Sequence, residues 1–174
     1  MNLVLIGYRG TGKTTLADLL HERLKLPVYY MDEILEARFG EKIASFVEKY
    51  GWDSFREEEQ LLAEELSEMD NIIIDCGGGV VTRDINISNL KKNGFVVWLQ
   101  LSPEIIARRI GHDKNRPSLT GTKTHTDEII EVLNERTPLY QKAADFTLRT
   151  DKKSHDECVE SILMEWGKKN NPSA

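Results

Sequence analysis

Cysteine is scarce in this sequence, since Cys76 and Cys158 are the only two among 174 residues and they lie far apart. Their separation does not fit the spacing of a zinc site, and it suits a reducing compartment, so we expect a cytoplasmic protein. No apolar run approaches the roughly 20 residues that span a bilayer. The first residues, MNLVLIGYRG, also lack the basic leader of a signal peptide. We therefore expect no membrane association.

Net positive charge is also absent, because 29 acidic residues outweigh 23 basic ones and give a formal net charge of −6. This balance gives no reason to expect nucleic acid as a partner. Neither heptads nor a long apolar surface stretch indicates an obligate oligomer, so a monomer is the default expectation. The length predicts a single domain over residues 1–170, followed by a polar tail at residues 171–174.

Short apolar runs bounded by Gly, Asn or Asp predict strands that are buried on both faces. We expect five strands, at residues 3–6, 27–30, 72–74, 95–99 and 145–150. The segments between them carry helical spacing, for example at Leu16, Leu19, Leu20 and Leu24, and at Phe55, Leu62 and Leu66. Further helices are expected from Asp32 to Phe39 and from about Ser154 to Lys168. Alternating strands and helices predict an α/β fold, in which helices cover both faces of a parallel sheet.

Residues 111–127, GHDKNRPSLTGTKTHTD, contain almost no apolar side chain and predict an exposed, mobile loop. A loop of this length in a compact domain is more often a lid or a binding loop than filler. We place a lid at about residues 111–125, with plain disorder as the alternative.

The stretch GYRGTGKT, residues 7–14, matches the pattern G-x-x-x-x-G-K-[ST] between a strand and a helix that we expect to begin near Thr15. Its glycines allow backbone N–H groups to surround phosphate oxygens, and the helix N-terminus favours negative charge. Lys13 would supply charge to the β- and γ-phosphates of ATP, and the Thr14 hydroxyl could bind Mg²⁺. We expect Arg9 to be solvated rather than catalytic. The residues predicted to bind the nucleotide here are Gly10, Thr11, Gly12, Lys13, Thr14 and Thr15.

Several polar residues and glycines should lie near this loop, because ligands of parallel sheets collect beyond the carboxyl ends of the strands. Asp32 follows the second predicted strand, and the triplet Gly77–Gly79 follows the third. Arg56 has Glu59 one helical turn later, at a spacing that can hold the guanidinium. Arg136 lies in a predicted helix late in the chain.

Together these segments resemble shikimate kinase over nearly the whole chain. The order and spacing of the pieces carry the resemblance, since only the phosphate loop is highly specific by itself. The matching pieces are GYRGTGKT, MDE at 31–33, FREEE at 55–59, CGGGVV at 76–81, KNRPSL at 114–119 and ERTPLY at 135–140. The resemblance implies a P-loop kinase-like three-layer sandwich with a central five-stranded sheet and a mobile lid. It also implies transfer of the γ-phosphoryl group of ATP to the 3-hydroxyl of shikimate, with Mg²⁺ as cofactor, in aromatic amino acid biosynthesis.

The resemblance assigns roles to individual residues. Asp32, in an acceptor-binding region at about 32–60, would bind and orient or deprotonate the hydroxyl. Arg56 and Arg136 would grip the carboxylate, which a planar arginine fork suits, and Gly77, Gly78 and Gly79 would let backbone approach the ring. The bland alternatives are surface ion pairs for the arginines and helix N-capping for Asp32.

On the nucleotide side, Arg116 resembles a lid arginine that closes over the phosphates and stabilises charge in the transition state. Lys13, Asp32 and Arg116 are therefore the candidate catalytic residues. Arg109 resembles a contact to the base, and Asp151 lies in TDK at 150–152, where the family holds adenine. A solvated arginine or an ordinary turn would explain each without a ligand.

The sequence departs from the family pattern at the end of the second predicted strand. Family members commonly carry D-T-D there, whereas this chain has Tyr30, Met31 and Asp32. A phenol carries no negative charge at neutral pH, so the carboxylate on the metal side is missing. Our hypothesis is that Asp75, which ends the run IIID, replaces it as a Mg²⁺ residue; a turn cap or a lysine partner is the alternative. Ser118 also replaces a usually apolar residue, with no expected change of reaction.

Two other functions remain open at this point. A kinase of the same architecture could act on gluconate or quinate. A nucleotide-binding regulator without turnover is conceivable because position 30 lacks its aspartate, although the retention of Lys13, Thr14, Asp32 and Arg116 argues against it.

Overall fold

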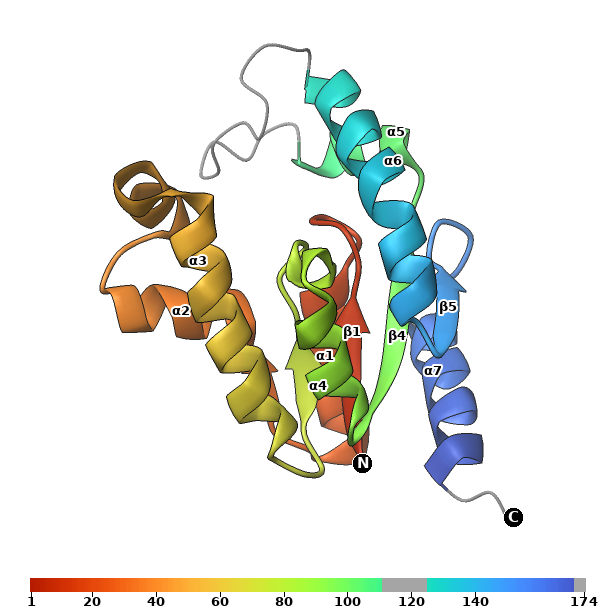
Figure 1. The fold of residues 1–174 in the computed structure, drawn as a ribbon. Helices are drawn as coiled ribbons and strands as arrows, with labels where there is room; N and C mark the ends of the chain where they lie inside the picture. The colour runs from red at the N-terminus through yellow and green to blue at the C-terminus, as the bar shows by residue number, and fades with distance from the viewer. Residues whose placement is uncertain (111–124, 171–174) are drawn as a thin grey trace.

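A computed structural model describes residues 1–110 and 125–170 of the chain, and within them the centre of the fold is a parallel sheet (Figure 1). Its strands follow the order β2-β3-β1-β4-β5, and every neighbouring pair is parallel. The bounds are β1 Asn2–Ile6, β2 Val28–Tyr30, β3 Ile73–Asp75, β4 Gly94–Gln100 and β5 Phe146–Arg149. The five predicted strands are confirmed, each within two residues of its expected ends.

Both faces of the sheet are covered, because side chains alternate along each buried strand. Leu3 and Leu5 of β1 face the layer formed by α1 (Lys13–Leu24) and α7 (His155–Asn170). Val4 and Ile6 face the opposite layer. That layer contains α2 (Met31–Phe39), α3 (Ile43–Ser67), α4 (Asp84–Lys91) and α6 (His125–Ala143). The predicted three-layer sandwich is confirmed.

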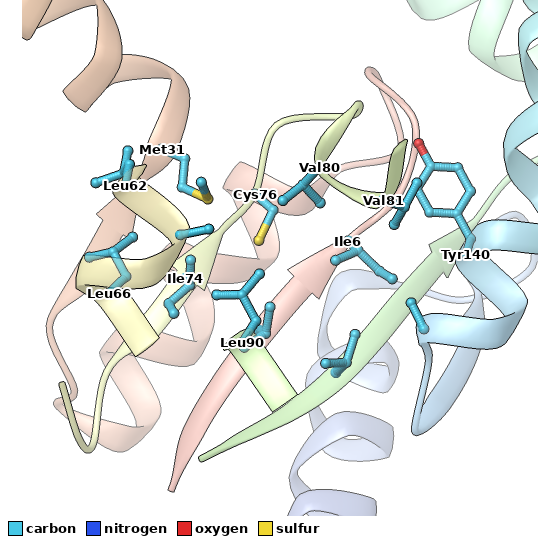
Figure 2. Packing of buried hydrophobic residues seen from close by; sticks show 14 of the residues in the cluster. Ile6, Met31, Leu62, Leu66, Ile74, Cys76, Val80, Val81, Leu90 and Tyr140 are labelled. Carbon is cyan, nitrogen blue, oxygen red and sulfur yellow. The ribbon is translucent and has the colours of Figure 1, made fainter. Parts of the chain in front are cut away.

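The core on the second face links the sheet to helices that carry candidate site residues (Figure 2). Met31 of α2, and Leu62 and Leu66 of α3, pack with Ile74 of β3 in this cluster. Tyr140 of α6 joins it from the other side and stacks on Trp98 with ring centroids 5.7 Å apart. The predicted apolar face of α3 is confirmed, since Phe55, Leu62 and Leu66 are all buried. Burial of these side chains therefore fixes α2, α3 and α6 relative to the strand ends.

Helix α3 is not straight, because Gly51 has φ 83° and ψ 167° inside it. Residues other than glycine rarely adopt that conformation. The turn divides α3 into a part that begins at Ile43 and a part that carries Arg56 and Glu59.

Two short elements complete the path of the chain. A 3-10 turn at Val80–Thr82 follows the glycine triplet, and α5 (Pro103–Ile110) packs beside α6 through Ile106 and Ile129. Within the described residues, no helix has the length and apolar character required to cross a membrane.

One boundary prediction is wrong, because α6 begins at His125, inside the segment 111–127 that we expected to be a loop. Asp127 and Glu128 lie in the first turn of this helix, where negative charge is favoured by the helix dipole. The loop prediction rested on the scarcity of apolar residues in this segment. The predicted lid, with Arg116 and Ser118, and the predicted tail at 171–174 lie outside the described residues.

Candidate active site

The phosphate loop follows β1 directly and lies at the carboxyl edge of the sheet. Gly7, Gly10 and Gly12 all have positive φ, with values of 145°, 77° and 94°. At Gly10 a side chain would also collide with Ile110 of α5. Helix α1 begins at Lys13, two residues earlier than expected. The loop therefore needs glycine for its backbone path and ends at a helix N-terminus, an arrangement that favours bound anions.

The Lys13 side chain is held over the phosphate loop by backbone carbonyl groups of the loop. Its ammonium group donates hydrogen bonds to the carbonyl oxygens of Gly7, at 3.0 Å, and Tyr8, at 3.2 Å. The buried Thr11 hydroxyl donates to the same Tyr8 oxygen at 2.7 Å. Thr11 thus stabilises the loop through its side chain, while Lys13 places a positive charge above it.

Thr14 and Asp75 meet at the junction of α1 and β3. The Thr14 hydroxyl donates to Asp75 Oδ2 at 2.6 Å, and Asp75 is buried at the end of its strand. Burial raises the pKa of Asp75, and this increase is opposed by the charge of Lys13 and by the Thr14 hydrogen bond. The sequence hypothesis placed Asp75 on the metal side, and the structure brings its carboxylate against the hydroxyl named for the metal.

Tyr30 lies beside Asp75, since the two are partners in the β2–β3 register. Its hydroxyl donates to the Asp18 carboxylate of α1, and this hydrogen bond, together with burial, raises the pKa of Tyr30 to about 12. Tyr30 is therefore a neutral phenol that is already hydrogen-bonded to another acid. Asp75, rather than residue 30, presents a carboxylate to Thr14.

The described residues contain no cluster of three or more His, Cys, Asp or Glu side chains that could hold a metal ion. Mg²⁺ does not require such a cluster, because it keeps several waters and usually takes one or two protein carboxylates beside substrate phosphates. A buried carboxylate that touches a hydroxyl at the phosphate loop supplies hard oxygen ligands. Thr14 and Asp75 therefore fit a magnesium site shared with a nucleotide.

A second part of the site is a pocket of about 550 Å³, partly open to solvent, between α2, α3, α6 and the glycine triplet. We call it the arginine pocket. Asp32, Arg56 and Arg136 come from three different helices and all line it. The lining residues are Tyr8, Arg9, Asp32, Ile43, Trp52, Phe55, Arg56, Glu59, Gly77, Gly78, Gly79 and Arg136.

Arg56 is fixed inside this pocket by contacts on several sides. Its guanidinium donates to Glu59 Oε2 at 2.6 Å and lies 5.3 Å from the ring centroid of Trp52 and 5.1 Å from that of Phe55. Glu59 is 1% exposed. Burial raises the pKa of Glu59, while Arg56 opposes the increase. The predicted i, i+3 pair is confirmed, and it leaves other N–H groups of Arg56 available to a ligand.

Each glycine of the triplet leaves room for a different neighbour. A Cβ atom at Gly79 would overlap the guanidinium of Arg56. At Gly77 it would lie 2.7 Å from Asp32 Oδ1 and 3.0 Å from Glu59 Oε1, which is too close for carbon. Without side chains at these positions, Asp32, Arg56 and Glu59 can all approach the same stretch of backbone.

The carbonyl oxygen of Gly78 joins the triplet to α6. It accepts hydrogen bonds from Arg136 Nη1 at 3.0 Å and from Tyr140 Oη at 2.5 Å. Tyr140 is fully buried, and burial raises its pKa to about 12, so it stays a donor. Sequence reasoning missed Tyr140, although its position one turn after Arg136 places both on one face of the helix.

A pocket of about 850 Å³, partly open to solvent, lies over the phosphate loop, and we call it the P-loop pocket. It contains Lys13, Thr14 and Asp75 among its lining residues. The full set is Arg9, Gly10, Lys13, Thr14, Tyr30, Met31, Asp32, Glu33, Asp75, Cys76, Gly78, Arg109 and Ile110. Arg9, Asp32 and Gly78 line both pockets, so these residues form the boundary between them. Arg9, which we expected to be solvated, is half-buried, and its Nε atom is buried.

Of the other residues predicted to bind the nucleotide, only some line the P-loop pocket. Arg109 lines the P-loop pocket and donates to the carbonyl oxygen of Gly10 at 3.1 Å. Thr15 is exposed and lines neither pocket, and neither does Asp151, which accepts a hydrogen bond from Arg149 at 3.0 Å. Arg116 lies outside the described residues.

Comparison with known proteins supports the resemblance seen in the sequence. A family model described as shikimate kinase matches residues 9–166. A shikimate kinase of Dehalococcoides mccartyi is 38% identical over 161 residues, which cover 92% of this chain and 90% of the relative. Among solved structures, shikimate kinase from Acinetobacter baumannii in complex with shikimate has a TM-score of 0.90 at 31% identity and covers 97% of this chain and 93% of its own. The enzyme from Aquifex aeolicus has a TM-score of 0.83 at 32% identity, covering 98% of both chains.

Proposed function

This chain belongs to the shikimate kinase family, and we propose that it transfers the γ-phosphoryl group of ATP to the 3-hydroxyl of shikimate. One observation carries the proposal: the arginine pocket and the P-loop pocket share a boundary that contains Asp32. A donor phosphate and an acceptor hydroxyl could therefore meet at that carboxylate. The products would be 3-phosphoshikimate and ADP.

The arginine pocket would bind shikimate through its carboxylate. Arg56 and Arg136 approach from α3 and α6, and a planar carboxylate accepts paired hydrogen bonds from guanidinium groups. Trp52 and Phe55 give the pocket an apolar wall for the ring. The glycine triplet permits close approach of backbone to the same ring.

The transfer step needs positioning and charge stabilisation more than covalent chemistry. Asp32 would accept a hydrogen bond from the 3-hydroxyl, orient its oxygen toward the γ-phosphorus and take its proton as the new P–O bond forms. Lys13 and the backbone N–H groups of Gly10 to Thr15 would hold the phosphates. Arg109 and Asp151 would lie near the base, and Arg116 stays a predicted lid residue.

Thr14 and Asp75 would hold Mg²⁺, which neutralises charge on the β- and γ-phosphates when it is bound. We predict that Asp75→Asn raises the Mg²⁺ concentration for half-maximal rate by about tenfold or more. The amide keeps an oxygen for the Thr14 hydrogen bond but loses the negative charge. The measurement is a Mg²⁺ titration of initial rate at saturating ATP and shikimate.

Asp84→Asn is a matched control for this titration, because the Asp84 carboxylate is exposed and pairs with Lys142 on the surface. It should leave the Mg²⁺ dependence unchanged. An Asp75→Asn enzyme with the Mg²⁺ dependence of the wild type would show that Asp75 has only a structural role.

A coupled ADP-release assay with shikimate, quinate and gluconate tests the proposed acceptor. We expect turnover with shikimate to exceed turnover with the other two. Faster turnover of quinate or gluconate would overturn the substrate assignment, and ATP binding with no acceptor-dependent ADP release would favour a regulator.

Asp32→Ala should lower kcat at least about 100-fold, the lower end of typical losses for general acid–base groups. Near-normal turnover would remove the role of Asp32.

Location and assembly follow less directly from the described residues. The two free cysteines, both buried, agree with a reducing compartment, and a cytoplasmic location stays a prediction. A monomer stays the default expectation.

A further inference from the structure

Arg9 lies where the two pockets meet. It lines both of them, a property it shares with Asp32 and Gly78. Gly78 has no side chain and Asp32 is acidic, so Arg9 is the cationic side chain that lines both pockets. Its role in the reaction depends on whether it is rigidly placed and whether its hydrogen-bonding groups are already used.

The backbone that leads into Arg9 is anchored. The Tyr8 carbonyl accepts hydrogen bonds from Thr11 Oγ1 and from Lys13 Nζ. Gly78 packs against the same peptide, since a Cβ atom there would be 3.4 Å from the backbone nitrogen of Arg9. The glycine triplet and the start of the phosphate loop therefore pack against each other. This packing holds residue 9 at the boundary before any ligand binds.

The Nε–H group of Arg9 is an unused donor. Its Nε atom is buried and has no hydrogen-bond partner within residues 1–110 and 125–170. The guanidinium carbon lies 5.8 Å from the Tyr8 ring centroid, a contact that orients the group but accepts no N–H hydrogen bond in its plane. A buried donor of a charged group is costly without an acceptor, so a water molecule or a ligand is expected to accept its hydrogen bond.

We propose that Arg9 donates hydrogen bonds to the phosphoryl group while it passes from ATP to the acceptor. This inference rests on the proposed function. In the transfer, the acceptor oxygen forms a bond to the γ-phosphorus, and the bond from that phosphorus to the β–γ bridging oxygen breaks. The bonding electron pair stays on the bridging oxygen of ADP, and the hydroxyl proton passes to Asp32. Charge is spread over the three other γ-oxygens at that moment.

The position of Arg9 suits those oxygens better than it suits the shikimate carboxylate. Two arginines, Arg56 and Arg136, already line the arginine pocket for that group, and neither lines the P-loop pocket. A residue at the boundary is placed to reach the phosphoryl group both before and after transfer. Interactions of this kind are strongest in the transition state and therefore act on kcat.

Arg9→Met and Arg9→Lys test the proposal. Methionine keeps an unbranched apolar stem beside Tyr8 without the charge, and lysine keeps the charge without the planar fork. We expect Arg9→Met to lower kcat about 100-fold or more, the usual loss when one preorganised donor to the transition state is removed. The KM values for shikimate and ATP should change by less than about threefold. Arg9→Lys should recover part of kcat.

The affinity for a mimic of the transition state distinguishes a role in phosphoryl transfer from a purely structural role. ADP, aluminium fluoride and shikimate, with Mg²⁺, would form a complex that mimics phosphoryl transfer. Calorimetry should show that Arg9→Met weakens this complex about 100-fold, while ADP alone and shikimate alone bind within about threefold of the wild type. Arg23→Met is the matched control, since Arg23 is an exposed arginine near the other end of α1, paired with Glu160. It should change none of these values.

Three outcomes would overturn the proposal. An unchanged kcat with a raised KM for shikimate would assign Arg9 to the carboxylate. Unchanged kcat and KM values would leave it no role in the reaction. If Arg9→Met does not fold, Arg9→Lys provides the test. Wild-type affinity of Arg9→Lys for ADP, aluminium fluoride and shikimate would contradict a requirement for the planar guanidinium. Failure of the wild-type enzyme to phosphorylate shikimate would instead reject the proposed function, so the two failures are distinguishable.

Discussion

At the scale of single residues, the distance of closest approach decides much of the candidate site. Gly79 is the clearest case, because a Cβ atom there would occupy the space of the Arg56 guanidinium. Arg56 cannot retreat easily, since Glu59, Trp52 and Phe55 hold it from other sides. Because Gly79 has no side chain, Arg56 can lie next to the backbone of the triplet, where the substrate is also proposed to bind.

We predict that Gly79→Ala raises the KM for shikimate about tenfold or more. Displacing Arg56 should weaken at least one charge-assisted hydrogen bond, which contributes about 1.5 to 3 kcal/mol, and about 1.4 kcal/mol corresponds to a tenfold change. The KM for ATP should stay close to that of the wild type. Gly167→Ala is the control, because a Cβ atom at Gly167 in α7 meets nothing within 4 Å. A Gly79→Ala enzyme with a normal KM for shikimate would show that Arg56 can move without loss.

Glu59 provides a pH-dependent prediction. Burial raises its pKa above the usual glutamate value despite the opposing charge of Arg56. The folded chain therefore holds this proton to higher pH than the unfolded chain does. The resulting stability is fully present below the unfolded pKa and is lost as pH rises through the folded pKa.

Glu59→Gln removes this titration, so the free energies of unfolding of the wild type and the variant are compared at each pH. We expect the free energy of unfolding of the wild type, minus that of the variant, to fall as pH rises from about 4 to neutrality. Urea unfolding at several pH values measures it. If the difference instead rises with pH, the ion pair with Arg56 outweighs burial and the pKa of Glu59 is lowered.

At the scale of whole elements, the turn at Gly51 sets the direction of α3. A side chain there would meet nothing within 4 Å, so its cost is conformational rather than steric. Because Arg56 and Glu59 follow Gly51 in the same helix, an altered turn should move the arginine pocket as well as weaken the fold.

Gly51→Ala should lower the free energy of unfolding by about 1 to 3 kcal/mol, the usual cost of a residue held in a sparsely populated backbone conformation. It should also raise the KM for shikimate more than the KM for ATP. Thermal unfolding and steady-state kinetics check the two effects. Unchanged stability would mean that the helix can straighten at residue 51 without loss.

The elements differ in how far sequence could predict them. Strand β1 and the phosphate loop have strong local patterns, so their structure follows from the stretch LVLIGYRGTGKT. Arg56 and Glu59 are neighbours through helical spacing alone. The meeting of Arg56 with Arg136 depends on how α3 and α6 pack, and no local pattern encodes that; only the family resemblance pointed to it. The place of Arg9 at the boundary of the two pockets depends on packing against Gly78, almost 70 residues away, so no local pattern predicted it.

At the scale of the whole molecule, three side chains of the arginine pocket, Asp32, Arg56 and Arg136, come from α2, α3 and α6. A ligand that binds all three side chains should stabilise the entire fold. We predict that shikimate at about 100 times its Kd adds about 2.7 kcal/mol to the free energy of unfolding. In a chain of this size the Tm should rise by roughly 5–11 °C. Thermal unfolding with and without shikimate measures the shift.

Arg136→Met should remove most of this stabilisation, because the arginine from α6 would no longer reach the carboxylate. Lys142→Met is a suitable control, since Lys142 lies on the same helix and makes only an exposed ion pair with Asp84 among the described residues. A full shikimate-induced shift in Arg136→Met would contradict the role of Arg136.

The boundary between the two pockets also matters for protein engineering. Among residues 1–110 and 125–170, only Arg9, Asp32 and Gly78 line both pockets, and Ile43, Trp52 and Phe55 line the arginine pocket alone. Libraries that vary those three apolar positions would reshape the space offered to an alcohol acceptor while every residue around the phosphates keeps its identity. The chain can therefore serve as a starting point for kinases with new small-molecule acceptors, with ATP use and acceptor choice selected separately.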